Sequence, residues 1–227
     1  TGADRRSVRK IWTQNWNNPS YGFTESEEGV FFRTRIGPAD VIMLDTRYFR
    51  EGDPSGEDNK TSFIGEAQMQ WLEQQLLDCK GPFIILTSGT MWSDYISSGK
   101  DSWGVWDKSG RERVLSFIET HRIPGVLLLS GDRHGARGFR IPRPSGHIFY
   151  EFEPASLGGL FGPPVFAEDC PEQLFGYESI RAFGELEFDT TLPDPEATFR
   201  LVQSDGIELY QIKLSLSQLT PPGVSRK

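Results

Sequence analysis

Long apolar runs, cysteine and positive charge are all scarce in this sequence of 227 residues. Because no apolar run approaches the roughly 20 residues that a membrane-spanning helix needs, the sequence predicts no transmembrane segment. Cys79 and Cys170 are too few for a disulfide framework or a cysteine zinc site, although one bridge between them stays open. The formal net charge of −8 argues against nucleic acid or an anionic membrane as a specific partner, since both bind basic surfaces.

Motifs of several enzyme classes are missing as well. The sequence has no G-x-S-x-G nucleophile elbow, no G-x-x-x-x-G-K-[ST] phosphate loop, no G-x-G-x-x-G fingerprint and no H-E-x-x-H zinc motif. Histidine occurs only three times. His121 is predicted to end a helix and His147 lies in a turn rich in Arg, Pro and Gly, which leaves His134 as the candidate for chemistry.

Three short apolar segments alternate with two helical patterns in the first part of the chain. Residues 41–44, 83–87 and 126–129 have the continuous apolar character of strands that are covered on both faces. Helices are predicted between them, over about residues 66–79 and 109–121. This order predicts a βαβαβ unit with a parallel sheet.

Local signals define the two predicted helices. In the first helix, Met69, Leu72 and Leu76 recur at spacings of three and four residues and therefore share one face. In the second, Ser109 and Glu112 have the spacing of a capping box, which predicts that this helix begins near Ser109.

Shorter strands with alternating polarity dominate after residue 135. Ser204-Asp205-Gly206 is a strong hairpin turn between two of them. We expect an antiparallel meander that packs on, or extends, the first sheet. Its strands are predicted over residues 139–141, 148–153, 184–188, 198–203 and 207–213.

Polar residues follow each of the three covered strands. In an open parallel sheet, ligands bind beyond the carboxyl ends of the strands, so we expect these residues to lie at one edge. The three clusters are Asp45-Thr46-Arg47, Ser88-Gly89-Thr90 and Asp132-Arg133-His134.

Asp132 and His134 form the sharpest pair among these polar residues. A carboxylate and an imidazole two residues apart can both reach one cation, and Gly131 and Gly135 allow the backbone to bend around it. The alternative is a turn aspartate next to a surface histidine. The spacing alone leaves both interpretations open.

Several segments combine into a more specific pattern than the Asp-x-His pair. They are Val41–Arg50 (VIMLDTRYFR), Gly65–Leu77 (GEAQMQWLEQQLL), Ser88–Ser93 (SGTMWS), Asp101–Trp103, Arg111–Leu115 (RERVL), Leu129–Ala136 (LSGDRHGA) and Pro154–Leu157 (PASL). In this order and spacing they resemble the alkaline phosphatase D-type enzymes of the calcineurin-like metallophosphoesterase superfamily. The resemblance covers roughly residues 1–160.

The resemblance implies an α/β fold in which a β-sandwich is flanked by helices, the αββα arrangement, here truncated in its N-terminal half. Residues 1–160 would form the C-terminal portion of the metallophosphatase core. Residues 161–227 would add antiparallel strands that pack on the same domain. Such enzymes hydrolyse phosphomonoesters or phosphodiesters and are usually exported, which implies a phosphate-ester substrate and a secreted or periplasmic location.

The resemblance also implies site residues and a cofactor. Asp132 and His134 match the last metal-binding motif of the family and would be ligands and catalytic residues. The centre would be dinuclear, with divalent or trivalent ions such as Fe, Ca, Mn or Zn, which polarise the phosphoryl oxygens and supply a hydroxide. Ser88 and Thr90 stand where relatives often place a histidine ligand, so they would line the substrate site. Arg47 would hold a phosphate oxygen or form a salt bridge with Asp45 or another carboxylate.

The sequence departs from the family pattern in its missing ligands. The Gly-Asp and Asp-Asp-His segments of the N-terminal half are absent, whereas a dinuclear centre needs on the order of six protein ligands. We therefore expect the C-terminal part of a longer enzyme, cut after those motifs, which alone binds divalent metal weakly and hydrolyses no phosphate ester. The start at Thr1, without Met or a signal peptide, agrees with processing or truncation.

Two other functions stay open. The first is a non-catalytic module that has lost its metals and binds a glycan or a protein through aromatic loops. Trp92, Trp103 and Trp106 would then line a cleft, whereas the competing interpretation places them in the core as loop anchors. The second is a subunit whose exposed sheet edge is completed by a partner.

Overall fold

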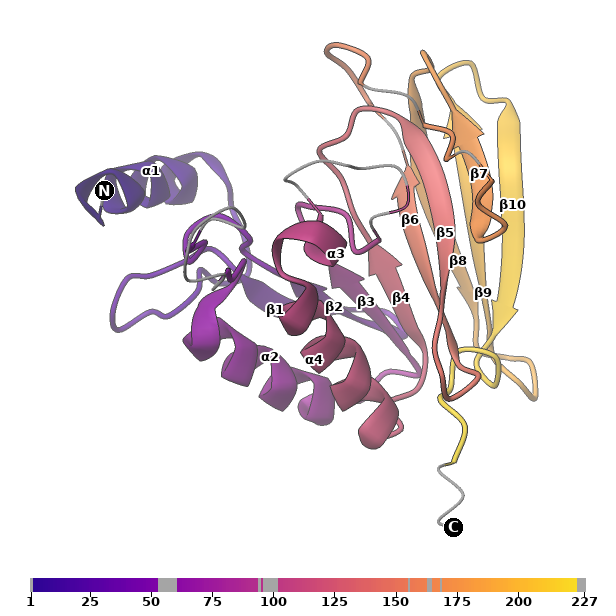
Figure 1. Cartoon of the computed structure of the whole chain (residues 1–227), viewed down its shortest axis with the longest axis horizontal. Helices are drawn as coiled ribbons and strands as arrows, with labels where there is room; N and C mark the ends of the chain where they lie inside the picture. Colours follow the sequence, from indigo (N-terminus) through magenta and orange to yellow (C-terminus); the bar gives the residue numbers. More distant parts are fainter. Residues whose placement is uncertain are drawn as a thin grey trace.

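Two facing β-sheets and a layer of helices make up the fold (Figure 1). The structure is a computed structural model. It describes residues 2–52, 61–93, 95, 102–154, 156–162, 165–167 and 169–223. This arrangement confirms the predicted α/β class with two facing sheets, and in the described residues the helices lie on the side of the larger sheet (Figure 1).

The larger sheet contains seven strands: β1 (Phe32–Ile36), β2 (Ala39–Met43), β3 (Phe83–Thr87), β4 (Val126–Leu129), β5 (Ala136–Pro142), β6 (Ile148–Pro154) and β7 (Gln173–Tyr177). Their order across the sheet is β1-β2-β3-β4-β6-β5-β7. The central strands β2, β3 and β4 pair in parallel, as the βαβαβ pattern predicts. Strand β6 also pairs in parallel with β4, although the sequence placed it in the antiparallel meander. The outer strands β1, β5 and β7 pair with their neighbours in antiparallel fashion.

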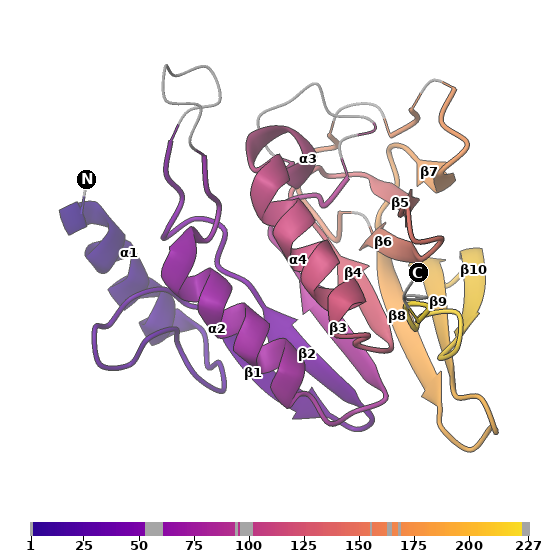
Figure 2. The same cartoon turned by 60° about the horizontal axis from the view of Figure 1, so that its bottom comes forward.

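Helices α2 (Gly65–Asp78) and α4 (Lys108–Thr120) cover one face of the larger sheet (Figure 2). The predicted stripe of α2 is buried there, together with alternate strand residues such as Ile84 and Leu86. Successive side chains of a strand point to opposite faces, so Phe83 joins the core on the other side. Both predicted helices are confirmed to within one residue at each end.

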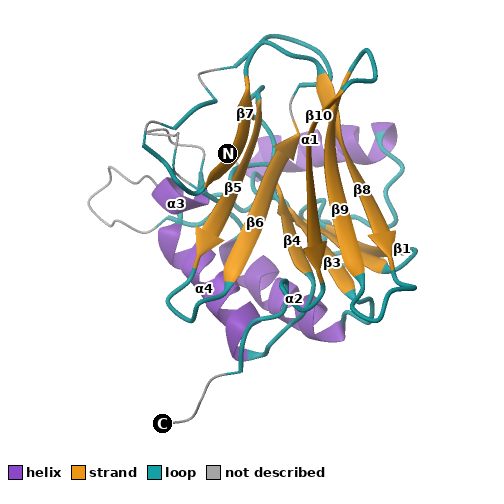
Figure 3. Ribbon diagram, turned by 90° about the vertical axis from the view of Figure 1, so that its right-hand side faces the viewer, coloured by secondary structure: helices purple, strands orange, loops and turns teal. Residues whose placement is uncertain are grey.

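The smaller sheet covers the opposite face of the larger one (Figure 3). It consists of β8 (Ala182–Asp189), β9 (Glu196–Gln203) and β10 (Glu208–Ser215), in the order β10-β9-β8 and antiparallel throughout. Phe199 of β9 stacks on Phe152 of β6 with ring centroids 4.1 Å apart, which joins the two sheets. The predicted antiparallel meander is confirmed for these three strands, whereas the predicted strands 139–141 and 148–153 belong to the larger sheet as β5 and β6.

The predicted capping box of the second long helix is wrong. Helix α4 begins at Lys108, and Asp107 caps it by accepting the backbone N–H of Gly110 at 2.8 Å. Glu112 pairs instead with Arg143 at 2.6 Å. The sequence motif was present, but an aspartate two residues earlier satisfies the free N–H groups of the first turn.

Other elements extend or complete the predicted set. Strand β5 begins three residues before the predicted 139–141, while β7 and the short helix α3 (Trp103–Trp106) had no sequence signal. The basic N-terminal stretch forms helix α1 (Gly2–Asn15). Strand β7 belongs to the larger sheet, and the division of the chain at residue 160 stays a prediction.

Neither cysteine forms a disulfide bond: Cys79 and Cys170 are both free. Burial raises the pKa of the Cys79 thiol to about 11, so this thiol is protonated at neutral pH. Within the described ranges, the helices are too short or too polar to cross a membrane.

Candidate active site at the strand ends

The three predicted polar clusters follow neighbouring strands. Strands β2, β3 and β4 are adjacent and parallel, so their carboxyl ends share one edge of the sheet. The backbone ladder continues past the strands, because Ser88 donates its N–H to the carbonyl of Leu129 at 3.0 Å. The loops that begin at Asp45, Ser88 and Ser130 therefore start side by side, although their side chains have different environments.

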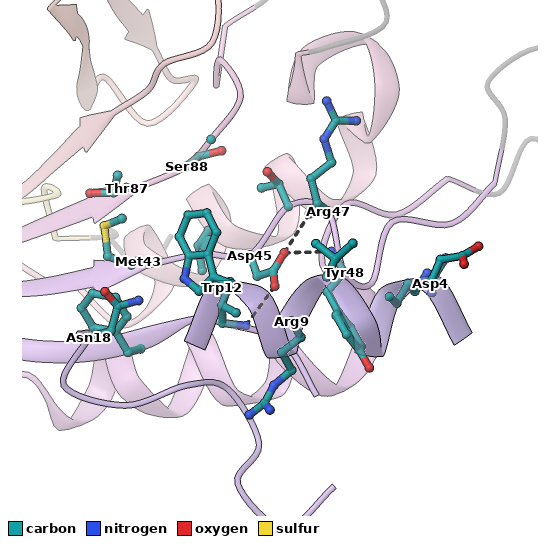
Figure 4. Close-up of a pocket in the computed structure, with 17 residues that line it drawn as sticks. Asp4, Arg9, Trp12, Asn18, Met43, Asp45, Arg47, Tyr48, Thr87 and Ser88 are labelled. Atoms are coloured by element: carbon teal, nitrogen blue, oxygen red, sulfur yellow. Dashed lines mark hydrogen bonds between the residues drawn. The ribbon is translucent and has the colours of Figure 1, made fainter. Parts of the chain in front are cut away.

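Asp45 stabilises its own turn. Its side chain is buried and accepts the backbone N–H groups of Val30, Arg47 and Tyr48 at 2.8 to 2.9 Å (Figure 4). Its backbone exchanges two hydrogen bonds with the side-chain amide of Gln68 on α2. The Asp45 carboxylate thus binds backbone groups of the protein itself.

Arg47 is exposed at the same turn, and its side chain points away from Asp45 (Figure 4). Within the part of the chain that the structure describes, no carboxylate forms an ion pair with Arg47. The predicted salt bridge with Asp45 is not formed. The guanidinium group is therefore accessible to an anion from solvent.

Ser88 and Thr90 anchor the loop that follows β3. Both residues are only 2% exposed. The Ser88 hydroxyl accepts the indole N–H of Trp103 at 2.9 Å and lies 3.2 Å from the Thr90 hydroxyl. Trp103 and Trp92 are fully buried and stack with ring centroids 5.0 Å apart, which favours the core interpretation for both tryptophans.

The turn after β4 projects Asp132 and His134 into solvent. Both side chains are exposed, and both residues adopt positive φ angles, 77° for Asp132 and 55° for His134. Non-glycine residues rarely occupy this region, and such strain is concentrated at functional sites. In the described residues, the Asp132 carboxylate has no hydrogen-bond or ion-pair partner.

The imidazole of His134 is oriented by a backbone carbonyl. Its Nδ1 lies 2.9 Å from the carbonyl oxygen of Leu160. Because a carbonyl oxygen can only accept, this contact assigns the proton of the neutral ring to Nδ1 and leaves the Nε2 lone pair available. Metal-binding histidines are typically held in this way, with one nitrogen donating to a carbonyl or a carboxylate.

A buried ion pair binds the backbone of this turn. Glu153 of β6 and Arg137 of β5 are 2% and 0% exposed, and their side chains approach to 3.1 Å. Glu153 accepts the backbone N–H of Arg133 at 2.8 Å, and Arg137 donates to the backbone carbonyl of the same residue at 3.1 Å. The pair thus holds both backbone polar groups of the residue between Asp132 and His134.

Burial dominates the electrostatics of this pair. It raises the pKa of Glu153 to about 8, because the loss of water outweighs the attraction of Arg137. Burial also lowers the pKa of Arg137 from its usual value, although Glu153 acts in the opposite direction. A buried ion pair adds little net stability, so its main consequence here is to fix the conformation of the turn.

A second glutamate of β6 holds the loop after β3. The buried Glu151 carboxylate accepts the backbone N–H groups of Trp92 and Ser93 at 2.7 and 2.9 Å. The sequence prediction missed the roles of Glu151, Glu153 and Arg137. A signal was present, because two glutamates alternate with aromatic residues in an otherwise apolar strand, but which loops they support depends on the neighbouring strands.

The donor set of the implied metal centre is incomplete. Across the described ranges, no group of three or more His, Cys, Asp or Glu side chains is placed to hold a metal ion. A catalytic metal site usually takes at least three protein ligands. Asp132 and His134 are suitable donors, but two donors alone do not make such a site.

A cavity of about 560 Å³ lies next to the candidate site, between α1 and strands β1 to β3 (Figure 4). Arg47 and Ser88 line it, whereas Asp132 and His134 do not. The strand-end edge therefore has two parts: the exposed turn after β4, and the cavity beneath α1. Asp101 and Ala155 of the family-like segments lie outside the described residues.

Comparisons with known proteins assign the family. The family model for PhoD-like phosphatases matches residues 14–171, which is most of the chain. The chain belongs to this family. The alkaline phosphatase D of Bacillus subtilis (strain 168) is 28% identical over 117 residues, which are 43% of this chain and 20% of that protein.

A solved structure has the same fold. The structure described as that of PhoD matches with a TM-score of 0.64 and 17% sequence identity, over 91% of this chain and 49% of that chain. The chain thus spans about half the length of that structure and a fifth of the Bacillus protein. The likeness shows that the two chains share a fold over nearly the whole length of this one.

Proposed function

We propose that the protein containing this chain hydrolyses phosphate esters at a metal centre to which Asp132 and His134 contribute. The observation that carries the proposal is the turn after β4. It presents a carboxylate without a partner and an imidazole whose Nδ1 is held by a carbonyl, on a backbone held by a buried ion pair. Membership of a phosphatase family makes ester hydrolysis the matching reaction.

Each residue has a distinct role in this proposal. Asp132 and the Nε2 of His134 would hold the metal, which would polarise the phosphoryl oxygens and supply an activated water. Arg47 binds a non-bridging phosphate oxygen, because its guanidinium is exposed and unpaired among the described residues. Ser88 and Thr90 act on the substrate only through the loop that they anchor.

In this proposal the remaining ligands come from a part of the protein outside this chain, so the 227-residue chain alone has weak metal affinity and negligible turnover. The centre would be dinuclear, with Fe, Ca, Mn or Zn as the candidate ions, and both monoesters and diesters are candidate substrates. Export to the periplasm or the exterior follows from the family resemblance alone.

Hydrolysis of p-nitrophenyl phosphate and bis-p-nitrophenyl phosphate tests the proposal, in the 227-residue chain and in a form extended before Thr1. His134→Ala and Asp132→Asn should each lower the rate of the extended form by roughly 100-fold or more and reduce its bound metal, measured by elemental analysis. His121→Ala is the matched control, since His121 lies at the end of α4. A rate unaffected by His134→Ala contradicts the proposal.

A further inference from the structure

The cavity beneath α1 combines apolar walls with a cationic edge. We propose that it binds the apolar alcohol portion of a phosphate ester, with the phosphate at Arg47, so that the preferred substrates are esters of extended apolar alcohols. This inference rests on the proposed function for the reaction but is argued from the cavity itself. Its volume, about 560 Å³, is in the range of small-molecule sites.

The apolar walls come from three elements. Trp12 projects from α1, Phe32 belongs to β1 and Met43 to β2, and all three line the cavity. Met43 lies on the opposite face of β2 from Ile42, which is buried against the helices. Trp12 is 40% exposed, so this apolar wall is accessible to a ligand from solvent.

Polarity changes along the strand direction. Phe32 and Met43 lie within the strands, whereas Arg47 and Ser88 follow the ends of β2 and β3. A ligand that fits this gradient has its apolar part over the strands and its polar group at the strand ends. These ends are also where the turn of Asp132 begins, one strand away from Ser88.

Charge selects an anionic polar group. Three arginines and two aspartates line the cavity. One of the aspartates, Asp45, is buried and bound to three backbone N–H groups, and Arg9 is bound to the carbonyls of Gly29 and Tyr21. The same two hydrogen bonds of Arg9 connect α1 to the segment before β1. Asp4 and Arg5 lie on α1, where Arg5 donates to the backbone carbonyl of Arg50 at 3.2 Å. Arg47, at the strand ends, is an exposed guanidinium without an ion-pair partner in the described residues.

Calorimetric titration with alkyl phosphates tests the inference. The probes are butyl, hexyl and octyl phosphate, with octanol and inorganic phosphate as references, titrated into the 227-residue chain in the presence of a chelator. Each buried methylene should strengthen binding up to about fourfold, so octyl phosphate should bind at least roughly tenfold tighter than butyl phosphate. Octanol and inorganic phosphate should each bind more weakly than octyl phosphate.

Paired variants locate the binding site. Met43→Trp fills the cavity and should weaken octyl phosphate binding by roughly tenfold or more, whereas Ile36→Trp, at an exposed position of the same sheet, should leave it unchanged. Arg47→Ala should weaken octyl phosphate roughly three- to tenfold but not octanol, and Arg6→Ala on α1 is its control. Circular dichroism and thermal unfolding confirm that each variant is folded.

Three results would overturn the inference: no dependence on alkyl length, equal binding of octanol and octyl phosphate, or binding that is insensitive to Met43→Trp. Loss of binding in a form extended before Thr1 would also overturn it, because the cavity would then be occupied by protein. The titration involves neither metal nor turnover, so its failure leaves the His134-dependent hydrolysis of small esters intact. Conversely, if the protein binds alkyl phosphates as expected but has no hydrolytic activity, only the proposed reaction is contradicted.

Discussion

Asp45 and Asp132 stand at equivalent places in the sequence and have opposite environments in the structure. Each follows a buried parallel strand, β2 or β4. Asp45 turns inward and binds three backbone N–H groups, while Asp132 points into solvent without a partner among the described residues. The difference lies in what supports each turn, because β6 and β5 provide Glu153 and Arg137 beneath the second one. In the second turn these two side chains bind the backbone of Arg133, so the turn does not need the Asp132 carboxylate as an acceptor.

Removing Arg137 should have the largest effect on stability. At about pH 9, above the pKa of Glu153, Arg137→Met leaves the buried carboxylate without its counter-charge and should lower the free energy of unfolding by about 3 to 5 kcal/mol. The measurement is urea unfolding monitored by circular dichroism. The double variant Arg137→Met/Glu153→Leu should recover part of the loss. If the double variant is no more stable than the single one, the ion pair is not the unit that supports the turn.

Substitution of Asp45 and of Asp132 should change the free energy of unfolding by clearly different amounts. Asp45→Ala leaves three backbone N–H groups without their acceptor and should cost about 3 kcal/mol of unfolding free energy. Asp132→Ala is the matched control, since it removes the same side chain from an exposed position, and should stay within about 0.5 kcal/mol. Similar losses in the two variants would show that the turns do not differ in this way.

Titration of Glu153 predicts a pH dependence of stability. Its folded pKa, about 8, lies above the unfolded value, so the folded state binds more protons between these values. Stability should therefore fall as pH rises from about 5 to 8, by at most about 1.4 kcal/mol per pH unit. Urea midpoints at several pH values measure the slope. Glu153→Gln should flatten it, and an unchanged slope would assign the dependence to another group.

Asp107 is a third aspartate that binds backbone N–H groups, and its substitution should have the smallest effect on stability. Asp107→Ala removes the acceptor for the N–H groups of Gly110 and Phe63 and should lower the unfolding free energy by about 1 to 2 kcal/mol. Ser109→Ala, at the wrongly predicted cap, should change it by less than about 0.5 kcal/mol. Thermal unfolding of the two variants decides which residue caps α4. A larger loss in Ser109→Ala than in Asp107→Ala would show that Ser109 is the cap, as the capping box predicted.

Much of the fold follows from local patterns. The strands β2, β3 and β4 and the helices α2 and α4 each have a continuous or periodic apolar signal, and the structure confirms all five. The missed elements have no such signal. Strand β7 lies in a segment of mixed polarity and depends on pairing with β5, whereas α3 is stabilised by the burial of Trp103. Sequence windows do not contain these distant partners.

The candidate site, too, could be predicted from the sequence only in part. The sequence selected Asp132 and His134 from their spacing and from a family resemblance, and it placed Arg47 and Ser88 at the same edge. It gave no means to tell that Ser88 is buried against Trp103 or that Arg47 is unpaired. Those outcomes depend on which side chains meet across strands and loops that lie far apart in the chain.

The sequence by itself determined the parallel centre of the larger sheet, the two covering helices, the antiparallel C-terminal strands and the family, because periodicity and motif order are local properties of the chain. Only the tertiary structure decided which aspartate binds its own backbone and which is free. For Asp132 it depends on Glu153 of β6, whose carboxylate binds the backbone of Arg133, 20 residues away in sequence. The same packing left an apolar cavity open beneath α1.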